Sequence, residues 1–271
     1  MDRRAFVAGS LGTAVSPTLA PAAGPEHATQ EAPPSGRPQL LELRRYRFRF
    51  GPMESRFGEY AKGALVPALN RAGVKPVGAF SVAIGPDSPM TYLLLPLPGP
   101  ELLASLPGRL AADPEYQRAA AAFRSLPASD PPYVRRESSL MVAFDSVPTL
   151  EVPAGAAAVP SRVFELRTYE SHNENATLKK IEMFEKGGEI QIFRRVGLTP
   201  VFLARNLVGS GLPSLTYMLV FADAAAREKG WAAFREDPGW VKLRSTAGYG
   251  NPEILTNIHN VLLRPADYSQ V

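Results

Sequence analysis

The feature that most constrains this chain is a pattern that occurs twice. The segment L-E-L-R-R-Y at residues 41–46 returns as F-E-L-R-T-Y at residues 164–169. Three further matches follow in the same order at an offset of about 124 residues. They are R-A-G-V-K-P-V (71–77) with R-V-G-L-T-P-V (195–201), T-Y-L (91–93) with T-Y-M (216–218), and D-P-E-Y (113–116) with D-P-G-W (237–240). A nearly constant offset over four matches indicates two copies of one unit.

The second copy has the clearer secondary-structure pattern. Alternation predicts a first strand over 162–169, and a helix over 173–195 follows, which Gly187-Gly188 bends or splits. Two hairpin strands, a second helical region after Asp223 and a last strand over 253–264 complete the copy. The order β-α-β-β-α-β is typical of the ferredoxin-like α+β fold.

A ferredoxin-like sheet carries helices on one face only, so its other face must be buried against something. We therefore expect two tandem ferredoxin-like repeats, packed sheet to sheet as an intrachain dimeric α+β barrel with the helices outside. In this arrangement Leu41, Leu43, Phe164 and Leu166 are expected to lie under the helices. The polar and aromatic side chains that alternate with them are expected to line the space between the sheets: Glu42, Arg44, Tyr46, Glu165, Arg167 and Tyr169.

Composition marks four segments along the chain. They are an export signal with a flexible tether (1–36), the first repeat (37–146), a Pro/Ala-rich linker (147–160) and the second repeat (161–271). Arg3-Arg4, followed by a mildly apolar run and small residues, resembles a twin-arginine export signal. The alternative is a disordered Pro/Ala-rich N-terminus. The export interpretation predicts a periplasmic or secreted protein with no stable membrane insertion after signal removal.

Several classes of function are excluded or disfavoured by composition. The absence of cysteine excludes disulfides, thiolate metal sites and cysteine nucleophiles. The net charge of +4 is spread along the chain, so no nucleic-acid partner is expected. A metal site would require His172, His259 and a carboxylate such as Glu165 to converge, and we predict none. No cofactor is predicted, and haem held by a single histidine is the less favoured alternative.

Three stretches carry a resemblance to a known family. F-E-L-R-T-Y (164–169), R-V-G-L-T-P-V (195–201) and A-A-A-R-E-K-G-W-A-A-F-R-E-D-P-G-W (224–240) are similar to the NIPSNAP family, within the dimeric α+β barrel superfamily. The resemblance covers residues 160–265, with 39–143 as a degenerate copy. It implies the fold more firmly than an activity, because the superfamily includes cofactor-independent monooxygenases, haem-handling enzymes and stress-response proteins. It carries over no catalytic residue.

The predicted function is that of an exported NIPSNAP-like protein that binds a small apolar or aromatic molecule between its two sheets. A cofactor-independent monooxygenase-like enzyme and a non-catalytic structural or interaction protein are the alternatives, so enzymatic activity is left open. Such an interaction protein would pair with another subunit through helix or edge-strand surfaces, and a homo-oligomer is compatible with the pattern. Glu165 and Arg167 either form a structural ion pair or face a ligand, whereas Trp231 and Trp240 are expected in the helix-to-sheet core. The candidate ligand-binding residues are Glu165, Arg167, Tyr169, His172, Tyr217, Asn257, His259, Arg44 and Tyr46.

Overall fold

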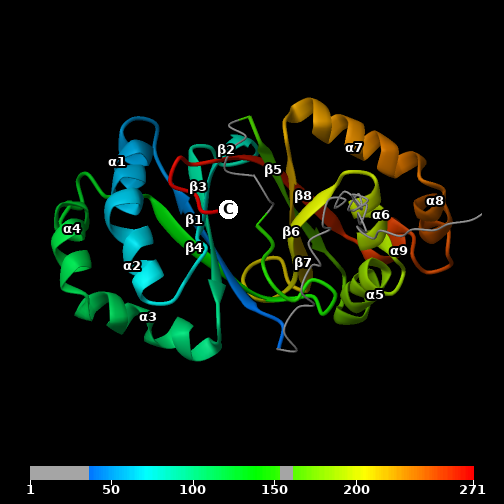
Figure 1. The fold of residues 1–271 in the computed structure, drawn as a ribbon, viewed down its shortest axis with the longest axis horizontal. Coiled ribbons are helices and arrows are strands. Elements are labelled where there is room, and N and C mark those ends of the chain that lie inside the picture. The colour runs from blue at the N-terminus through cyan, green and yellow to red at the C-terminus, as the bar shows by residue number, and fades with distance from the viewer. Residues whose placement is uncertain (1–36, 153–160) are drawn as a thin grey trace, which may run out of the picture. The chain divides into compact units, whose positions relative to one another are not determined.

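The described strands close into one antiparallel barrel of eight strands, with helices on its outside (Figure 1). The structure is a computed structural model that describes residues 37–152 and 161–271, so the predicted export signal lies outside the described residues. The strands are β1 (Leu40–Arg47), β2 (Gly78–Ile84), β3 (Met90–Leu97), β4 (Arg135–Ala143), β5 (Val163–Glu170), β6 (Thr199–Val208), β7 (Ser214–Phe221) and β8 (Asn257–Pro265). Their order around the barrel is β1-β3-β2-β8-β5-β7-β6-β4.

The helices of the first half cover strands β1 to β4 on one side of the barrel (Figure 1). They are α1 (Met53–Tyr60), a π-helical turn η1 (Ala61–Leu65), α2 (Val66–Arg71), α3 (Pro100–Ala112) and α4 (Pro114–Arg124). The first three run on from one another as a single helical segment. Pro67 lies just beyond η1 and has no amide hydrogen, so a standard helical turn would lose a hydrogen bond there. π-helical turns are rare, and they occur mostly as single turns inside α-helices, as η1 does here.

The second half carries α5 (Glu174–Glu185), α6 (Glu189–Arg195), α7 (Ala224–Glu236), α8 (Pro238–Arg244) and α9 (Asn251–Ile254). The predicted split of the long helix is confirmed, because Gly188 adopts a φ of 85° between α5 and α6. Asp223 and Asp237 accept amide hydrogens at the starts of α7 and α8. The last strand begins later than predicted, at Asn257, because α9 forms first. Among the described helices, none is long and apolar enough to cross a bilayer.

Two seams join the halves of the barrel, and both are edge-to-edge strand pairs. Strand β2 pairs with β8, and β4 pairs with β6. The expected barrel is therefore present, but the sheets continue into each other instead of stacking as separate layers. Each described strand has a neighbour on both sides, so none of them offers the free edge that strand-edge pairing with another subunit would need.

The interior of the barrel is apolar, and this corrects the predicted facing of the strands. Phe164 and Leu166 point inward, where they pack with Leu41 and Leu43 and with side chains from the other six strands. An eight-stranded barrel is just wide enough for side chains to fill, and a charge there costs several kcal/mol unless it is paired. The alternating set, which includes Glu165, therefore faces the helices.

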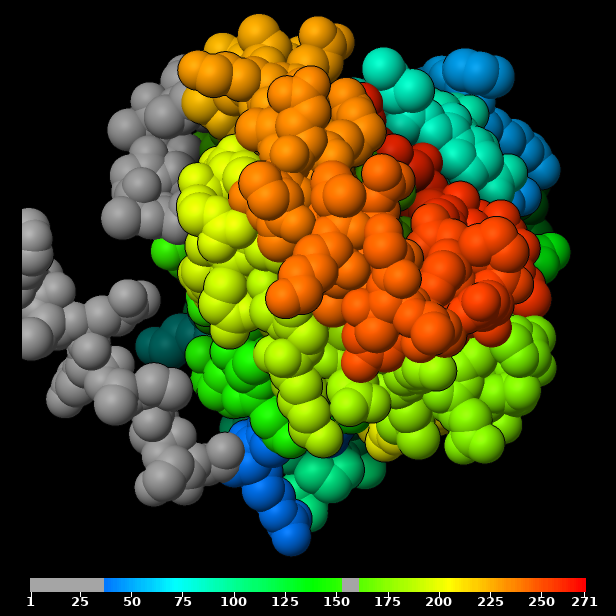
Figure 2. Space-filling model, turned by 90° about the vertical axis from the view of Figure 1, so that its right-hand side faces the viewer, coloured from blue at the N-terminus to red at the C-terminus, as the bar shows by residue number. Residues whose placement is uncertain are grey.

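Two further layers lie between the barrel wall and the helices. In the first half, Tyr46 packs with Phe57 of α1. In the second half, Tyr169 and Tyr217 pack with aromatic residues of α5 to α7. Figure 2 views the second half from outside, where α7 and α8 form the orange part of the surface. The prediction that Glu42, Arg44 and Tyr46 line an inter-sheet space is wrong for the same reason as for Glu165.

Candidate functional site

Glu165 lies at the centre of a polar cluster between β5 and α7. Its side chain is fully buried. Arg227 donates two hydrogen bonds to it, from Nε at 2.7 Å and from Nη2 at 3.1 Å, and Trp231 donates its indole hydrogen at 2.7 Å. Arg227 and Trp231 are four residues apart and so share one face of α7. The carboxylate thus joins the helix to the barrel wall.

Arg167 lies beside this cluster and makes one hydrogen bond to it. One hydrogen bond of 3.3 Å connects its Nη1 to Glu165. Its guanidinium lies over the ring of Trp231, 4.7 Å from the centroid, and 5.5 Å from the centroid of Tyr169. Its buried Nε has no hydrogen-bond partner among the described residues. A guanidinium has five donor hydrogens, so Arg167 has donors to spare.

Two tyrosines extend the cluster below Arg167. The hydroxyl groups of Tyr169 and Tyr217 are 2.8 Å apart, and the rings meet edge to face at a centroid distance of 5.4 Å. Burial raises the pKa of Tyr169, and it raises the pKa of Tyr217 well above its ordinary value. Both hydroxyl groups therefore stay protonated at neutral pH and can donate hydrogen bonds, but they are poor bases.

A pocket of about 690 Å³ opens beside this cluster. Arg167 and Tyr169 form its wall on β5, and α7 supplies the facing wall. Four aromatic side chains line it: Tyr169, Trp231, Phe234 and Trp240. Its charged lining residues are Arg167, Arg227, Arg235 and Glu228. The combination of aromatic faces and a few convergent polar groups is typical of a small-molecule site.

Comparison with known proteins places this cluster in a recognised family region. The family model described as NIPSNAP matches residues 164–270, which include every residue of the cluster. Residues 164–270 form a NIPSNAP domain. A search of the curated proteins found no match.

Solved structures with the same architecture extend beyond the NIPSNAP domain. A candidate monooxygenase from Lactobacillus acidophilus superimposes with a TM-score of 0.56 at 8% identity, covering 84% of this chain and 94% of its own. A candidate monooxygenase from Fusobacterium nucleatum gives a TM-score of 0.54 at 10% identity, covering 84% and 93%. An uncharacterised NIPSNAP-like domain protein from Burkholderia xenovorans is 20% identical over 41% of this chain and 91% of its own, with a TM-score of 0.37. For the two monooxygenase structures the likeness is one of fold.

The other predicted residues of the NIPSNAP domain do not join the cluster. His259 lies 2.8 Å from Glu170 and 2.9 Å from Asn257, and it is exposed at one end of the barrel interior, on the same face of the sheet as Thr168. His172 is exposed and lines a separate shallow pocket near the start of α5. Neither histidine lines the pocket beneath α7. No group of three potential metal ligands occurs among the described residues.

Outside the NIPSNAP domain, Glu42 and Arg44 have the same spacing along β1 as Glu165 and Arg167 have along β5, but the hydrogen bonds of the arginine differ. Arg44 binds Glu42 with both Nε and Nη2, at 2.8 and 2.9 Å, and Ser138 completes the carboxylate's partners at 2.7 Å. Arg44 and Glu42 are both buried. Arg44 thus makes two short hydrogen bonds to its carboxylate, whereas Arg167 makes a single one of 3.3 Å.

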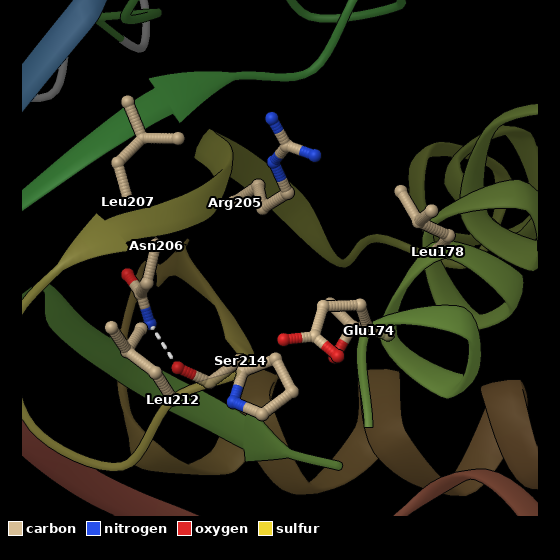
Figure 3. A pocket seen from close by; sticks show the side chains of 9 residues that line it. Glu174, Leu178, Arg205, Asn206, Leu207, Leu212 and Ser214 are labelled. Carbon is tan, nitrogen blue, oxygen red and sulfur yellow. Dashed lines mark hydrogen bonds between the residues drawn. The ribbon is translucent and has the colours of Figure 1, made fainter. Parts of the chain in front are cut away.

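Two other pockets compete with the one beneath α7. The first, of about 430 Å³, lies at one end of the barrel interior, where Thr168, Thr216 and Asn206 form a closed hydrogen-bonded set. The second, of about 280 Å³, lies between α5 and β6 (Figure 3). Leucines surround it and Asn206 donates a hydrogen bond to Ser214 on its wall, but no aromatic side chain lines it. The first of these pockets holds one aromatic residue, Tyr92, and Arg45, which pairs with Glu137 at 3.0 Å. Neither pocket has the four aromatic side chains that line the one beneath α7.

Sequence reasoning missed one buried ion pair and the pocket-lining role of two tryptophans. Lys180 and Glu189 form an ion pair of 2.7 Å that is almost completely buried, behind Tyr169 and Trp240. They lie on either side of the glycine break, so no helical spacing could have revealed the pair. Trp231 and Trp240 pack against the helix-to-sheet core as expected, and both also line the pocket. The i, i+4 spacing of Arg227 and Trp231 was a signal that could have linked them.

Proposed function

We propose that the NIPSNAP domain binds a small aromatic molecule in the pocket between β5 and α7. The observation that supports this best is the lining of four aromatic side chains around a partly engaged arginine. Aromatic rings bury large areas and stack favourably on one another, which favours a flat, apolar guest. This site differs from the one predicted between the two sheets, where inward side chains now fill most of the space.

Binding is favoured over catalysis by the titratable groups at the pocket. The one carboxylate among its described lining residues is Glu228, which is exposed, and no histidine lines it. Tyr169 is held protonated by burial. A general base must lie within hydrogen-bond reach of the proton it removes. The exposed carboxylate of Glu228 is a weak candidate for that base. A cofactor-independent monooxygenase activity is the second proposal, because Arg167 is placed to stabilise a substrate anion.

The binding proposal can be tested with N-phenyl-1-naphthylamine, a neutral fluorescent aromatic probe. The chain has two tryptophans, and both line this pocket, so energy transfer from tryptophan to probe reports on it directly. Ala232→Phe should fill the pocket and abolish the transfer. Leu178→Phe, in the pocket of Figure 3, is the matched control and should leave it unchanged. The opposite result would place the aromatic site between α5 and β6. Oxygen uptake with bound aromatic compounds tests the monooxygenase alternative.

We further propose that residues 37–146 and 161–271 are tandem ferredoxin-like repeats. The ordered sequence matches support this, as does the strand order β4-β1-β3-β2 in one half and β8-β5-β7-β6 in the other. If it is correct, residues 161–271 expressed alone should pair their β6 and β8 edges with a second copy. Native mass spectrometry should then detect a dimer, and a folded monomer would count against the proposal.

We also propose export by the twin-arginine route, on the basis of Arg3-Arg4 and the apolar run that follows. Replacing both arginines by lysine should keep the precursor inside the cell, while a tagged wild-type chain reaches the periplasm. Unchanged export of the lysine variant would remove the proposal.

A further inference from the structure

The pocket beneath α7 carries a net positive charge. Arg167, Arg227 and Arg235 line it, and two carboxylates oppose them: the exposed Glu228 in the lining and the buried Glu165, which pairs with Arg167 and Arg227. Three cations against two carboxylates leave one positive charge at the pocket. A neighbouring shallow pocket shares Trp240 and Asn251 with it and adds Arg244. Clefts lined by one sign of charge concentrate ligands of the opposite sign. The surroundings therefore favour an anion.

The arginines are not equivalent, because Glu165 has only two oxygens to share. Arg227 Nε and the indole nitrogen of Trp231 both donate to Oε2, at 2.7 Å each, and Arg227 Nη2 donates to Oε1 at 3.1 Å. What remains for Arg167 is one contact of 3.3 Å, and its Nε is without a partner in the described part of the chain. Buried donors are rarely left without a partner, so a missing acceptor deserves an explanation.

Arg44 and Glu42 form the corresponding pair in the first half, where no hydrogen bond from a helix residue to the carboxylate is seen among the described residues. There the guanidinium closes on Glu42 with two short bonds. In the second half, Arg227 and Trp231 occupy the carboxylate instead and leave Arg167 facing the pocket. The contrast indicates that Arg227 and Trp231 are positioning residues that keep Arg167 available.

Arg167 is also held over an aromatic ring. Its guanidinium carbon lies 4.7 Å from the centroid of the Trp231 ring, which Glu165 fixes through the indole nitrogen. A guanidinium carries its donors along its edge and can bind a planar acceptor with two of them. An aromatic body packed against Trp240 and Phe234 would place an acidic oxygen on its ring within reach of that edge.

We propose that the ligand of this site is an aromatic anion, a carboxylate, sulfonate or phenolate, whose charged oxygens are received by Arg167. This inference rests on the proposed function and adds the charge of the ligand. It assigns Arg167 as the residue that selects an anion over its neutral counterpart.

The test compares a neutral and an anionic probe with the same aromatic skeleton. 8-Anilino-1-naphthalenesulfonate carries a sulfonate on the skeleton of N-phenyl-1-naphthylamine. A charge-assisted hydrogen bond contributes enough for the anionic probe to bind wild-type protein about tenfold more tightly. In Arg167→Gln this preference should disappear while the neutral probe still binds. Arg167→Lys should keep part of it, and Arg205→Gln, an exposed arginine of the pocket in Figure 3, should keep all of it.

The outcomes separate the two proposals. Equal affinity of both probes for the wild-type protein would overturn the inference and leave the aromatic site intact. Loss of both probes in Arg167→Gln would also overturn it, because Arg167 would then maintain the pocket rather than select the charge. Binding of neither probe to the wild-type protein would remove the proposed function together with the inference.

Discussion

The indole nitrogen of Trp231 lies 2.7 Å from a carboxylate oxygen of Glu165, and this bond ties one wall of the pocket to the barrel. Because Arg227 binds the same carboxylate, helix α7 is held at two successive turns of one face. The position of the helix, and hence the width of the pocket, depends on one buried side chain.

Glu165→Gln should destabilise the fold by about 3 kcal/mol, because it leaves the partly buried charges of Arg227 and Arg167 without their counter-ion. Urea unfolding followed by tryptophan fluorescence measures this directly. Glu228→Gln, on the exposed rim of the same pocket, is the control and should change stability by less than about 0.5 kcal/mol. Equal stability of both variants would show that Glu165 is not the anchor.

The Lys180–Glu189 pair predicts a non-additive double mutant. Lys180→Met leaves a buried carboxylate without its cation and should cost about 3 kcal/mol or more. Adding Glu189→Leu removes the orphaned charge from an apolar, aromatic setting and should restore much of the loss. A double-mutant cycle by urea unfolding gives the coupling energy. Additive losses in the two single variants would contradict this account of the pair.

Glu42 predicts a specific acid sensitivity. Burial alone would raise its pKa, but the hydrogen bonds and charge of Arg44 outweigh burial and hold the pKa below its ordinary value of 4.5. A lowered pKa contributes stability above about pH 4.5 that is lost as the pH falls through the folded-state value. The stability difference between wild type and Glu42→Gln should therefore be largest near neutral pH and shrink in acid. Urea midpoints at several pH values test this, and a constant difference would contradict it.

Gly187 predicts a steric limit at the break between α5 and α6. A Cβ atom there would lie 2.5 Å from the carbonyl oxygen of Met183 and 2.8 Å from Leu243. Gly187→Ala should therefore lower the melting temperature. Gly63→Ala, in the helical segment of the first half, meets nothing within 4 Å and should stabilise by up to about 1 kcal/mol. A stabilising Gly187→Ala would show that the break relaxes without cost.

The sequence alone could predict the order of strands and helices, because the repeated motifs align the two halves and the glycine break is visible locally. It could not decide which face of β5 turns inward. Phe164, Leu166 and Tyr169 place large side chains on both faces, and alternation defines two sets without saying which is inside. The deciding partners of Glu165 lie on α7, 62 and 66 residues further along the chain.

The candidate site could likewise be predicted only in part, because the sequence did not show which face of each strand turns inward. Arg167, Tyr169 and Tyr217 do meet, since they lie on the paired strands β5 and β7. His259 lies on β8, which also pairs with β5, but its side chain faces away from the tyrosines and binds Glu170 instead. Distance along the sheet could be inferred from the repeat, whereas the side on which each residue lies could not.

The two seams have a consequence for how the molecule opens. Each seam is registered over four residue pairs and contains an irregularity, between Val82 and Ile84 in one and between Leu140 and Met141 in the other. By contrast, β1 and β3 are matched over eight pairs without interruption, and the four pairs of β2 with β3 contain no irregularity. Transient opening should therefore begin at the seams, and amide hydrogen exchange should be fastest there. Each opening would bare two strand edges together, so protection against aggregation depends on how quickly a seam closes again.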